Sequence, residues 1–442
     1  MSEEHSRAPV DERRAWPQPG RDIAVVLASL LVACGALRAW RVAHHAPGID
    51  FYDYWVVGRA VGRGDIPSIY EHSSRAALGQ EFLRRALAEG SPRQRAAAQF
   101  RQVLEPTSTP FLYATLTPFA RAHYDASLDV YLAFSLASLL AALFILGRLV
   151  GQTRLDRLLL IALVVYAFQP MQSDLRVGNV SQIQLALLAV YAWLGAGGGT
   201  ARQVGAGTVL GAAVAFKPSI VVIAPLLFAW WALAEQWRRL VRQAAGFAGG
   251  GLVAVLLGAL WFGSLHAWTD WLAALGSAGL PAMPVENGNV SVLAVTRRWP
   301  GVTLGALPAV ATSLAVLAAL WVRRKSGRTG GRAEADAPAV EDLLLIGAGC
   351  LVVLLSSPLV WLHYLVLALP AVIVLLRPQA RRRWPAIAAF VAVAMDPWTD
   401  LFGMPDPVRH ATVAIAGLAL LFVLVLVEIA AGQNHAGRQV EM

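Results

Sequence analysis

The chain has 442 residues, of which 57% are hydrophobic and only 15% are charged. Soluble globular domains carry about 25% charged residues, so this composition excludes a soluble globule and predicts a polytopic membrane protein. The net charge of +9 does not indicate a nucleic-acid partner, because the basic residues are spread among many segments instead of being gathered on one face.

Residues 1–22 form a polar tail ahead of the first apolar segment, and no small-residue cleavage site follows that segment. This pattern predicts a cytoplasmic tail and a retained signal-anchor helix. A single transmembrane domain is expected over residues 23–431, followed by a second cytoplasmic tail at 432–442. Cys34 and Cys350 lie inside apolar segments without metal-ligand spacing, and we interpret both as buried apolar side chains.

Apolar segments of roughly 17–25 residues, long enough to cross about 30 Å of hydrocarbon, recur along the chain. They predict an all-α transmembrane helix bundle of about twelve spans, within a range of about ten to thirteen. The expected spans are residues 23–43, 126–147, 157–171, 181–197, 203–216, 219–235, 243–263, 302–322, 341–356, 361–376, 384–398 and 410–431. The pair 203–216 and 219–235 is also consistent with one hairpin broken at Lys217-Pro218, because proline interrupts a helix.

Basic residues are distributed unevenly between the predicted loops. With the N-terminus inside, sixteen fall in short inner loops and five in short outer loops. The inner set is Arg148, Arg154, Arg157, Arg202, Arg238, Arg239, Arg242, Arg323, Arg324, Lys325, Arg328, Arg332, Arg377, Arg381, Arg382 and Arg383, and the outer set is Arg176, Lys217, Arg297, Arg298 and Arg409. Short cytoplasmic loops are enriched in Lys and Arg, so the asymmetry supports this orientation and an even number of spans.

Two long loops, residues 44–125 and 264–301, are then expected on the outer side. Within the first, residues 74–104 alternate Arg, Ala and Leu at helical spacing, which predicts an amphipathic helix on the membrane surface. The inner loop 323–340 is rich in Arg, Gly and Ala and is expected to be disordered. The sequence has no internal repeat, Gly-rich phosphate loop or Walker-type lysine, which counts against an ATP-driven pump.

The segment 48–55 places two carboxylates, Asp50 and Asp53, among four aromatic residues just past the first apolar span. Charged groups beside a bilayer cost free energy unless they pair or function, so one carboxylate is a candidate general base, and Tyr54 and Trp55 are candidate sugar-stacking residues. The alternative is an interfacial aromatic belt with two solvated acids.

Other polar sites recur on the predicted outer side. They are the turn at 172–182 with Asn179 and Gln182, the lysine Lys217, the segment with Asn289 and Ser291 before Arg297, and the segment with Trp361, His363 and Tyr364. Lys217 is one of only two lysines and suits a phosphate at the membrane surface, but it also fits a snorkelling helix-end lysine. His363 is equally consistent with a hydrogen bond to a neighbouring carbonyl, and Arg297 with a solvated basic pair.

The order of these sites along the chain resembles glycosyltransferase family 87, of the GT-C superfamily. The resemblance rests on Asp50-Phe51 with Trp55, Gly64-Asp65 with Ile69-Tyr70, Gly178-Asn179 with Gln182, Phe216-Lys217-Pro218, Gly288-Asn289-Val-Ser291 with Arg297, and Ser357-Pro358 with Trp361-Leu-His363-Tyr364. It covers nearly the whole chain. The sequence departs from the family after the first loop, where Tyr113 to Pro118 replace an expected Tyr-Pro-Pro-like element, which leaves acceptor preference open.

The resemblance implies transfer of mannose, or of arabinofuranose, from a polyprenyl phosphate to a glycan or glycolipid hydroxyl on the outer face of the plasma membrane, with inversion. Asp50 occupies the position of the base. The implied groups on the donor phosphate are Lys217, His363 and Arg297, and the implied substrate-binding residues are Asp53, Tyr54, Trp55, Asn179, Gln182, Asn289, Ser291, Trp361 and Tyr364. No cofactor and no metal are expected, since a DxD-like pair is absent. The expected partners are the donor, the acceptor and membrane lipid, with no nucleic acid.

Two other functions fit parts of the pattern. A carrier or flippase for a lipid-linked sugar would also use an intramembrane lysine and broken helices, but it needs a polar path to the inside, and the inner halves of the spans read as almost wholly apolar. Another GT-C enzyme, such as a protein O-mannosyltransferase or an oligosaccharide ligase, differs only in its acceptor.

Overall fold

The computed structural model describes residues 19–64, 69–277, 283–299, 304–325, 337–378, 380, 382–394 and 406–431. The described part is all-helical and contains no β-strand beyond an isolated bridge between Asn289 and Trp361. The predicted all-α class is therefore confirmed. The predicted tails at 1–22 and 432–442 and the predicted disordered loop at 323–340 lie largely outside the described residues.

The helices follow one another along the chain with short connections. The first group is α1 (Pro19–His44), α2 (Ile49–Val61), α3 (His72–Glu89), α4 (Pro92–Phe100), α5 (Pro110–Leu116), η1 (Thr117–Ala120), α6 (Tyr124–Leu149), α7 (Arg154–Ala167), α8 (Gln169–Val177), α9 (Ser181–Gly195), α10 (Thr200–Phe216), η2 (Pro218–Ile220) and α11 (Ile223–Leu233). The second is α12 (Trp237–Phe262), α13 (His266–Ser277), η3 (Val285–Asn287), α14 (Val292–Thr296), α15 (Leu307–Lys325), α16 (Ala337–Ser356), η4 (Leu362–Ala368), α17 (Leu369–Leu375), α18 (Arg383–Ala394) and α20 (Pro407–Ala431).

Long apolar helices form the bundle. Within the described residues, α1, α6, α12, α15, α16 and α20 are long and apolar enough to cross a membrane, and α7 with α8 forms a further candidate bent by 62°. Each of the twelve apolar segments expected from the sequence contains a helix. Several are short, however: α9 has 15 residues, about 22 Å, against roughly 30 Å of hydrocarbon. The protein is multi-helical and apolar, and the count of twelve crossings stays a prediction.

The helix break at Lys217-Pro218 is confirmed. Helix α10 ends at Phe216, Lys217 adopts an extended backbone with φ −144°, and Pro218 begins the short helix η2. The freed Phe216 carbonyl accepts a hydrogen bond from the Thr109 hydroxyl at 3.2 Å, and the Lys217 carbonyl accepts one from the Gln184 amide at 3.0 Å. These side chains satisfy the backbone that proline leaves unpaired, which fixes the position of Lys217.

Helices α10 and α12 are packed at backbone distance by four glycines. A Cβ atom built on Gly207, Gly211 or Gly246 would lie 2.1 Å from a carbonyl oxygen of the facing helix, and one built on Gly250 would lie 2.2 Å from such an oxygen. Spacing of four residues places both glycines of each helix on one face, as in membrane helix pairs with small residues at the interface. This close pair forms a rigid wall beside the Lys217 break.

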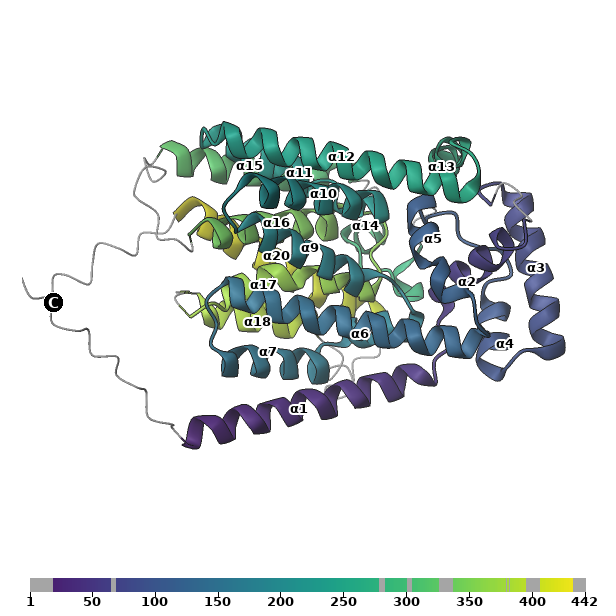
Figure 1. Cartoon of the computed structure of the whole chain (residues 1–442). Helices are drawn as coiled ribbons and strands as arrows, with labels where there is room; N and C mark the ends of the chain where they lie inside the picture. Colours follow the sequence, from purple (N-terminus) through teal and green to yellow (C-terminus); the bar gives the residue numbers. More distant parts are fainter. Residues whose placement is uncertain are drawn as a thin grey trace, which may run out of the picture.

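The predicted long outer loops lie together at one end of the bundle. Helices α2 to α5 and α13 gather there, opposite the end at which α1 begins (Figure 1). The prediction of a single amphipathic helix over 74–104 is wrong, because α3 ends at Glu89 and a separate helix, α4, begins at Pro92. Ser91 caps α4 by accepting a hydrogen bond from the Gln94 amide at 3.1 Å, and Pro92 fits its first turn. Its interfacial location stays a prediction.

A buried polar network lies at the opposite end of the helices, so the expectation of almost wholly apolar inner halves is wrong. Arg239 is ion-paired with the buried Asp342. Gln243 donates to Gln203 at 2.5 Å and accepts from the Tyr191 hydroxyl at 3.2 Å. Arg239, expected in an inner loop, lies in the first turn of α12, and Gln203, Gln243 and Asp342 lie near the starts of their helices. They are bonded to one another, as buried polar groups between helices require, and they tie four helices together.

The two cysteines differ in burial. Cys350 is buried in α16, as predicted, whereas Cys34 is exposed on α1. The prediction for Cys34 is wrong with respect to protein packing because α1 runs along the outside of the bundle (Figure 1). Exposed apolar neighbours such as Leu30 and Leu31 share that outer surface of α1, which suits contact with lipid.

Candidate active site

The first turn of α2 is held in place by Gly48. This residue has φ +65°, and a Cβ on it would lie 2.8 Å from the Leu128 side chain. Its amide donates to the Arg176 carbonyl at 3.3 Å, and its own carbonyl accepts a bond from the Tyr124 hydroxyl at 3.0 Å. Glycine is favoured where a positive φ and a close approach coincide. The anchored turn places Asp50, two residues later, against α8 and α9.

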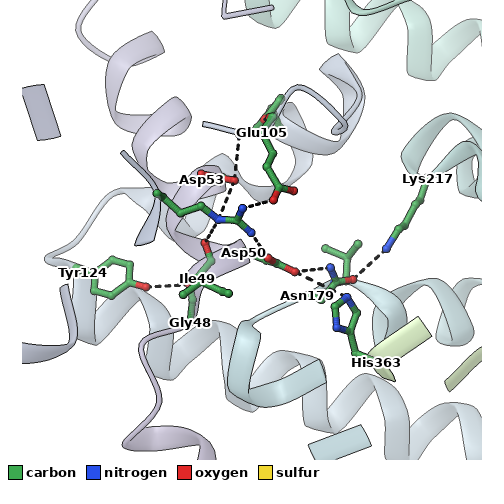
Figure 2. A network of polar contacts seen from close by, with 12 residues as sticks. Gly48, Ile49, Asp50, Asp53, Glu105, Tyr124, Asn179, Lys217 and His363 are labelled. Carbon is green, nitrogen blue, oxygen red and sulfur yellow. Dashed lines mark hydrogen bonds and ion pairs between the residues drawn. The ribbon is translucent and has the colours of Figure 1, made fainter. Parts of the chain in front are cut away.

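Asp50 lies at the centre of a polar cluster drawn in Figure 2. One carboxylate oxygen accepts a hydrogen bond from Arg101 Nη2 at 2.5 Å, and the other accepts one from Asn179 Nδ2 at 2.6 Å. His363 Nε2 lies 3.9 Å from the second oxygen. The Asp50 side chain is 15% exposed, so it is held from two sides while it stays accessible.

Arg101 is surrounded by three carboxylates. Besides Asp50, its guanidinium pairs with Glu105 and lies 3.4 Å from Asp53, and its Nε donates to the Ile49 carbonyl at 3.2 Å. Burial raises the pKa of Asp53 well above its usual range, and the charge of Arg101 opposes that rise. Asp53 is buried with one oxygen unbonded among the described residues, so it lies behind the guanidinium and away from the accessible side of Asp50.

Arg101 and Glu105 are cluster residues that the sequence pattern does not predict. Both lie just beyond the end of α4: Arg101 falls within residues 74–104, which the helical pattern assigns to an amphipathic surface helix, and Glu105 follows that stretch directly. Their spacing of four residues was the available signal, because a guanidinium and a carboxylate so placed can pair. The pairing across the chain to Asp50 has no local signature.

Asn179 links Asp50 to Lys217. Its side-chain oxygen accepts a hydrogen bond from Lys217 Nζ at 2.9 Å, while its NH₂ group donates to Asp50. Gly178, at φ +69°, ends α8 and turns the chain, and the Tyr131 hydroxyl donates to the Asn179 carbonyl at 2.5 Å. Lys217 Nζ also lies 4.2 Å from the centre of the Tyr364 ring, a cation–π contact. The ammonium is thus part of the cluster and does not snorkel away from it.

His363 is buried in η4 and packs edge-on against Tyr364 at a ring-centre distance of 4.7 Å. Its Nε2 atom is buried and has no hydrogen-bond partner among the described residues. The alternative interpretation, a bond to a neighbouring carbonyl, therefore matches no contact within the described part of the chain. Buried polar atoms are rarely left unbonded, so this nitrogen is available to a ligand.

Asn289, Ser291 and Trp361 hold the segment that carries His363. The Asn289 side chain donates to the Pro358 carbonyl at 3.1 Å and accepts from the Val360 amide at 3.0 Å, and the Ser291 hydroxyl also donates to the Pro358 carbonyl at 3.0 Å. A backbone bridge joins Asn289 to Trp361. These residues position η4 from the adjoining loop, and their contact with substrate stays a prediction.

Tyr54 and Trp55 pack into the protein beneath the cluster. Both are buried, Tyr54 meets Tyr113 edge-on at 6.2 Å, and the Trp55 indole donates to the Ala122 carbonyl at 3.2 Å. Whether either ring stacks on a sugar stays a prediction. The alternative interpretation of this segment is a surface belt of aromatic residues with solvated acids. The burial of Tyr54 and Trp55 does not match it.

Gln182 and Arg297 lie apart from the contacts that join the cluster. Gln182 is fully buried, and its amide donates to the Met171 carbonyl at 3.1 Å. Arg297 is exposed after α14, and its neighbour Arg298 pairs with Glu286. Among the described residues the structure thus brings together Asp50, Asp53, Asn179, Lys217, His363 and Tyr364 of the predicted set, with Arg101 added.

Comparisons with known proteins agree with the motifs. The model of glycosyltransferase family 87 matches residues 107–358. A relative from Mycobacterium tuberculosis, a polyprenol-phosphate-mannose-dependent alpha-(1-2)-phosphatidylinositol mannoside mannosyltransferase, is 28% identical over 360 residues, which cover 74% of this chain and 78% of the relative. No solved structure matches. Because the matched segment is more than half of the chain and contains Asn179, Lys217 and Asn289, the chain belongs to glycosyltransferase family 87.

Proposed function

We propose that this protein transfers mannose from a polyprenyl-phosphate sugar to a hydroxyl of a glycan or glycolipid on the outer face of the plasma membrane, with inversion at the anomeric carbon. Family membership supports glycosyl transfer, and the printed name of the mycobacterial relative supports a polyprenol-phosphate-mannose donor and a glycolipid acceptor. The observation that carries the proposal is the accessible carboxylate of Asp50 beside a lysine ammonium and an unbonded histidine nitrogen.

Asp50 acts as the general base in this proposal. The acceptor hydroxyl attacks the anomeric carbon, the bond from that carbon to the phosphate oxygen breaks, and the hydroxyl proton passes to the Asp50 carboxylate. Arg101 and Asn179 each bond a different oxygen of that carboxylate, so its orientation is fixed before the acceptor arrives. An inverting displacement needs one carboxylate at the reacting centre, which agrees with Asp53 lying behind Arg101.

Lys217 and His363 stabilise the leaving phosphate. A phosphate monoester leaves as an anion of low basicity, so positive charge and hydrogen-bond donors are needed in place of a general acid. Lys217 uses one N–H on Asn179 among the described residues, which leaves two donors for phosphate oxygens. The Nε2 atom of His363 is the second donor when that nitrogen carries the proton.

The outer-face location rests on charge and on the arrangement of helices. The cluster lies near the end of the bundle where α2 to α5 gather, and the arginine-rich helix ends, such as the start of α12 and the end of α15, lie at the other end (Figure 1). Basic helix ends favour the cytoplasmic side, so the cluster is proposed to face outward.

Transfer is tested with membranes from cells that express the wild-type chain or an Asp50→Asn variant. Both are incubated with polyprenyl-phosphate mannose that carries a radioactive sugar, and the label is followed into glycolipid and polysaccharide fractions. Label in a product fraction with the wild type alone supports transfer. Label that crosses the membrane but stays on the polyprenyl phosphate would identify a carrier and contradict the proposal.

A further inference from the structure

A cleft separate from the Asp50 cluster opens at the end of the molecule where α2, α3 and η1 meet. It has a volume of about 740 Å³ and lies between the second half of α2, the C-terminal half of α3 with the start of α4, the residues around η1, and Trp261 at the end of α12. Ligand sites in proteins are concave and measure roughly 300–1,000 Å³. The cleft is therefore large enough for one or two sugar rings with their substituents.

Its walls carry an excess of positive charge. Four arginines line it, Arg59, Arg63, Arg85 and Arg121, against the single carboxylate of Glu89. Glu81, outside the lining, pairs with Arg63 at 3.4 Å and also with Arg85. The Arg121 side chain is exposed, and within the described part of the chain no carboxylate pairs with it or with Arg59. The unbalanced charge points to an anionic occupant.

Aromatic rings orient these guanidinium groups. Arg63 and Arg85 lie 4.9 Å and 5.4 Å from the centre of the Phe82 ring, and Arg59 lies 5.5 Å from that of Trp55. A guanidinium over a ring face keeps its N–H groups in its own plane. One such group of Arg63 and one of Arg85 pair with Glu81, and one of Arg59 donates to the Arg121 carbonyl at 3.3 Å, so the remaining N–H groups are the ones that match the oxygens of a phosphate or carboxylate. A flat, mobile patch of lysines would suit a membrane surface, whereas these stacked arginines line a concavity and suit a defined ligand.

The cleft and the cluster share helix α2. Arg59 follows Asp50 by nine residues, a rise of about 14 Å along the helix axis and about two and a half turns, so the two side chains leave α2 on opposite sides and an acceptor that reaches both must extend around the helix. Tyr124 lines the cleft and also donates its hydroxyl to the Gly48 carbonyl at the start of α2. The donor phosphate is already assigned to Lys217 and His363, so the cleft remains for the other substrate.

We propose that this cleft binds the anionic part of the acceptor, a sugar or headgroup that carries a phosphate or a carboxylate, while a hydroxyl of the same molecule reaches Asp50. The proposal rests on the proposed transfer and adds that the acceptor is charged and extended. The four arginines then select among acceptors and take no part in the chemical step.

The test compares three acceptors of equal mannose content. One carries a phosphodiester headgroup, one carries a glucuronic acid residue in its place, and one is a neutral mannosyl diacylglycerol. In Arg85→Gln and Arg121→Gln, KM for a charged acceptor should rise about tenfold, the loss of roughly one charge-assisted hydrogen bond, while kcat, donor KM and KM for the neutral acceptor stay as in the wild type. Arg84→Gln is the matched control, since Arg84 is exposed on the same helix but does not line the cleft.

A rise in KM for the phosphodiester acceptor identifies a phosphate as the bound anion, and a rise for the glucuronic acid acceptor identifies a carboxylate. Either result supports the proposal. Equal rises with charged and neutral acceptors, or no rise with any, would overturn it. If the wild type transfers to none of them, binding of mannose 6-phosphate against mannose to the purified full chain decides the matter. The cleft is supported, even though transfer has failed, if the chain binds mannose 6-phosphate in preference to mannose, and if this preference is lost in Arg121→Gln but kept in Lys217→Ala. Equal binding of the two sugars to the wild type rejects the proposal.

Discussion

At the scale of single residues, the cluster around Asp50 is organised by two side chains of opposite character. Arg101 supplies a buried charge that three carboxylates share, and Asn179 supplies an amide that bonds Asp50 on one side and Lys217 on the other. A neutral amide between a carboxylate and an ammonium keeps the two charges from forming a direct pair. Both groups then keep bonding capacity for substrates.

Asp50→Asn should lower the transfer rate by about 10²–10⁴-fold, the usual contribution of a general base. Asparagine keeps the shape and can accept the bond from Arg101, which still pairs with Asp53 and Glu105, but its NH₂ group cannot accept the bond from Asn179. Lys217 keeps its own bond to Asn179, so expression and donor binding should stay nearly unchanged. Asp53→Asn should be milder. Initial rates with saturating donor measure both variants, and a dead Asp53→Asn beside an active Asp50→Asn would exchange the two roles.

Lys217→Ala should weaken donor binding by about 1.5–3 kcal/mol, the range for hydrogen bonds to charged groups. Lys217→Arg should restore only part, since a planar guanidinium cannot reproduce the geometry of a compact ammonium over the Tyr364 ring. Lys325→Ala, at the other lysine of the chain, is the control and should bind donor as the wild type does. Equilibrium binding of polyprenyl-phosphate mannose is the measurement, and unchanged affinity in Lys217→Ala would return this lysine to an anchoring role.

How far the sequence predicts the site depends on the kind of residue. Lys217 and His363 stand out because polar groups are rare among apolar segments, and both lie in the cluster. Arg101 does not stand out, because one more arginine in an Arg-rich amphipathic stretch reads as solvated. Asn289 and Ser291 stand out equally, yet their bonds to the Pro358 carbonyl show them fastening a loop. The composition of a segment identifies polar residues that are unusual there. Only the fold distinguishes the residues that lie in the Asp50 cluster from those that hold the surrounding loops in place.

At the scale of elements, apolar length predicts where helices lie, and local turn chemistry decides where they stop. The apolar segments from 23 to 431 each contain a helix, and the break at Pro218 follows from proline itself. The stop at Gly90 was missed, since periodic Arg, Ala and Leu continue on both sides of it, and the cap at Ser91 prevails over that periodicity. The number of membrane crossings does not follow from the lengths of the apolar segments alone when helices are as short as α9.

Replacement of Gly250 by alanine should destabilise the pair of α10 and α12 by about 1–3 kcal/mol, because the new methyl group meets the Thr208 carbonyl at 2.2 Å and the helices must separate. Gly251→Ala is the matched control, as nothing lies within 4 Å of a Cβ at that position. Thermal unfolding in detergent should show a lower Tm for the first variant only. An equal Tm for the two variants would mean that the close approach is dispensable.

At the scale of the whole molecule, polar contacts gather at two ends and apolar surface lies between them. One end holds the Asp50 cluster, and the other holds Arg239 with Asp342 and the glutamines near them. The second network joins α9, α10, α12 and α16 through side-chain bonds, which suits helix association, while Arg239 Nε and Asp342 Oδ1 are buried without a hydrogen-bond partner among the described residues. This separation fits an enzyme that works at one membrane face.

The predicted orientation is tested with single cysteines in a Cys34→Ala, Cys350→Ala background. Ala88→Cys on α3 and Thr269→Cys on α13 should react from outside with a membrane-impermeant thiol reagent, and Ala201→Cys at the start of α10 should react only after the membrane is opened. All three positions are exposed. Reaction of Ala201→Cys from outside in intact cells would reverse the orientation and place the cluster inside.

The span of sequence that the cluster joins affects how the protein is made. Asp50 lies in the second helix of the chain, whereas His363 lies in η4, more than 300 residues later. A ribosome adds roughly 5–20 residues per second, so on the order of tens of seconds separate the synthesis of the two. During that time the nascent chain holds Asp50 and Lys217 without His363. Under the proposed mechanism, a chain released early would hold Asp50 and Lys217 without His363, and we expect no sugar transfer from it.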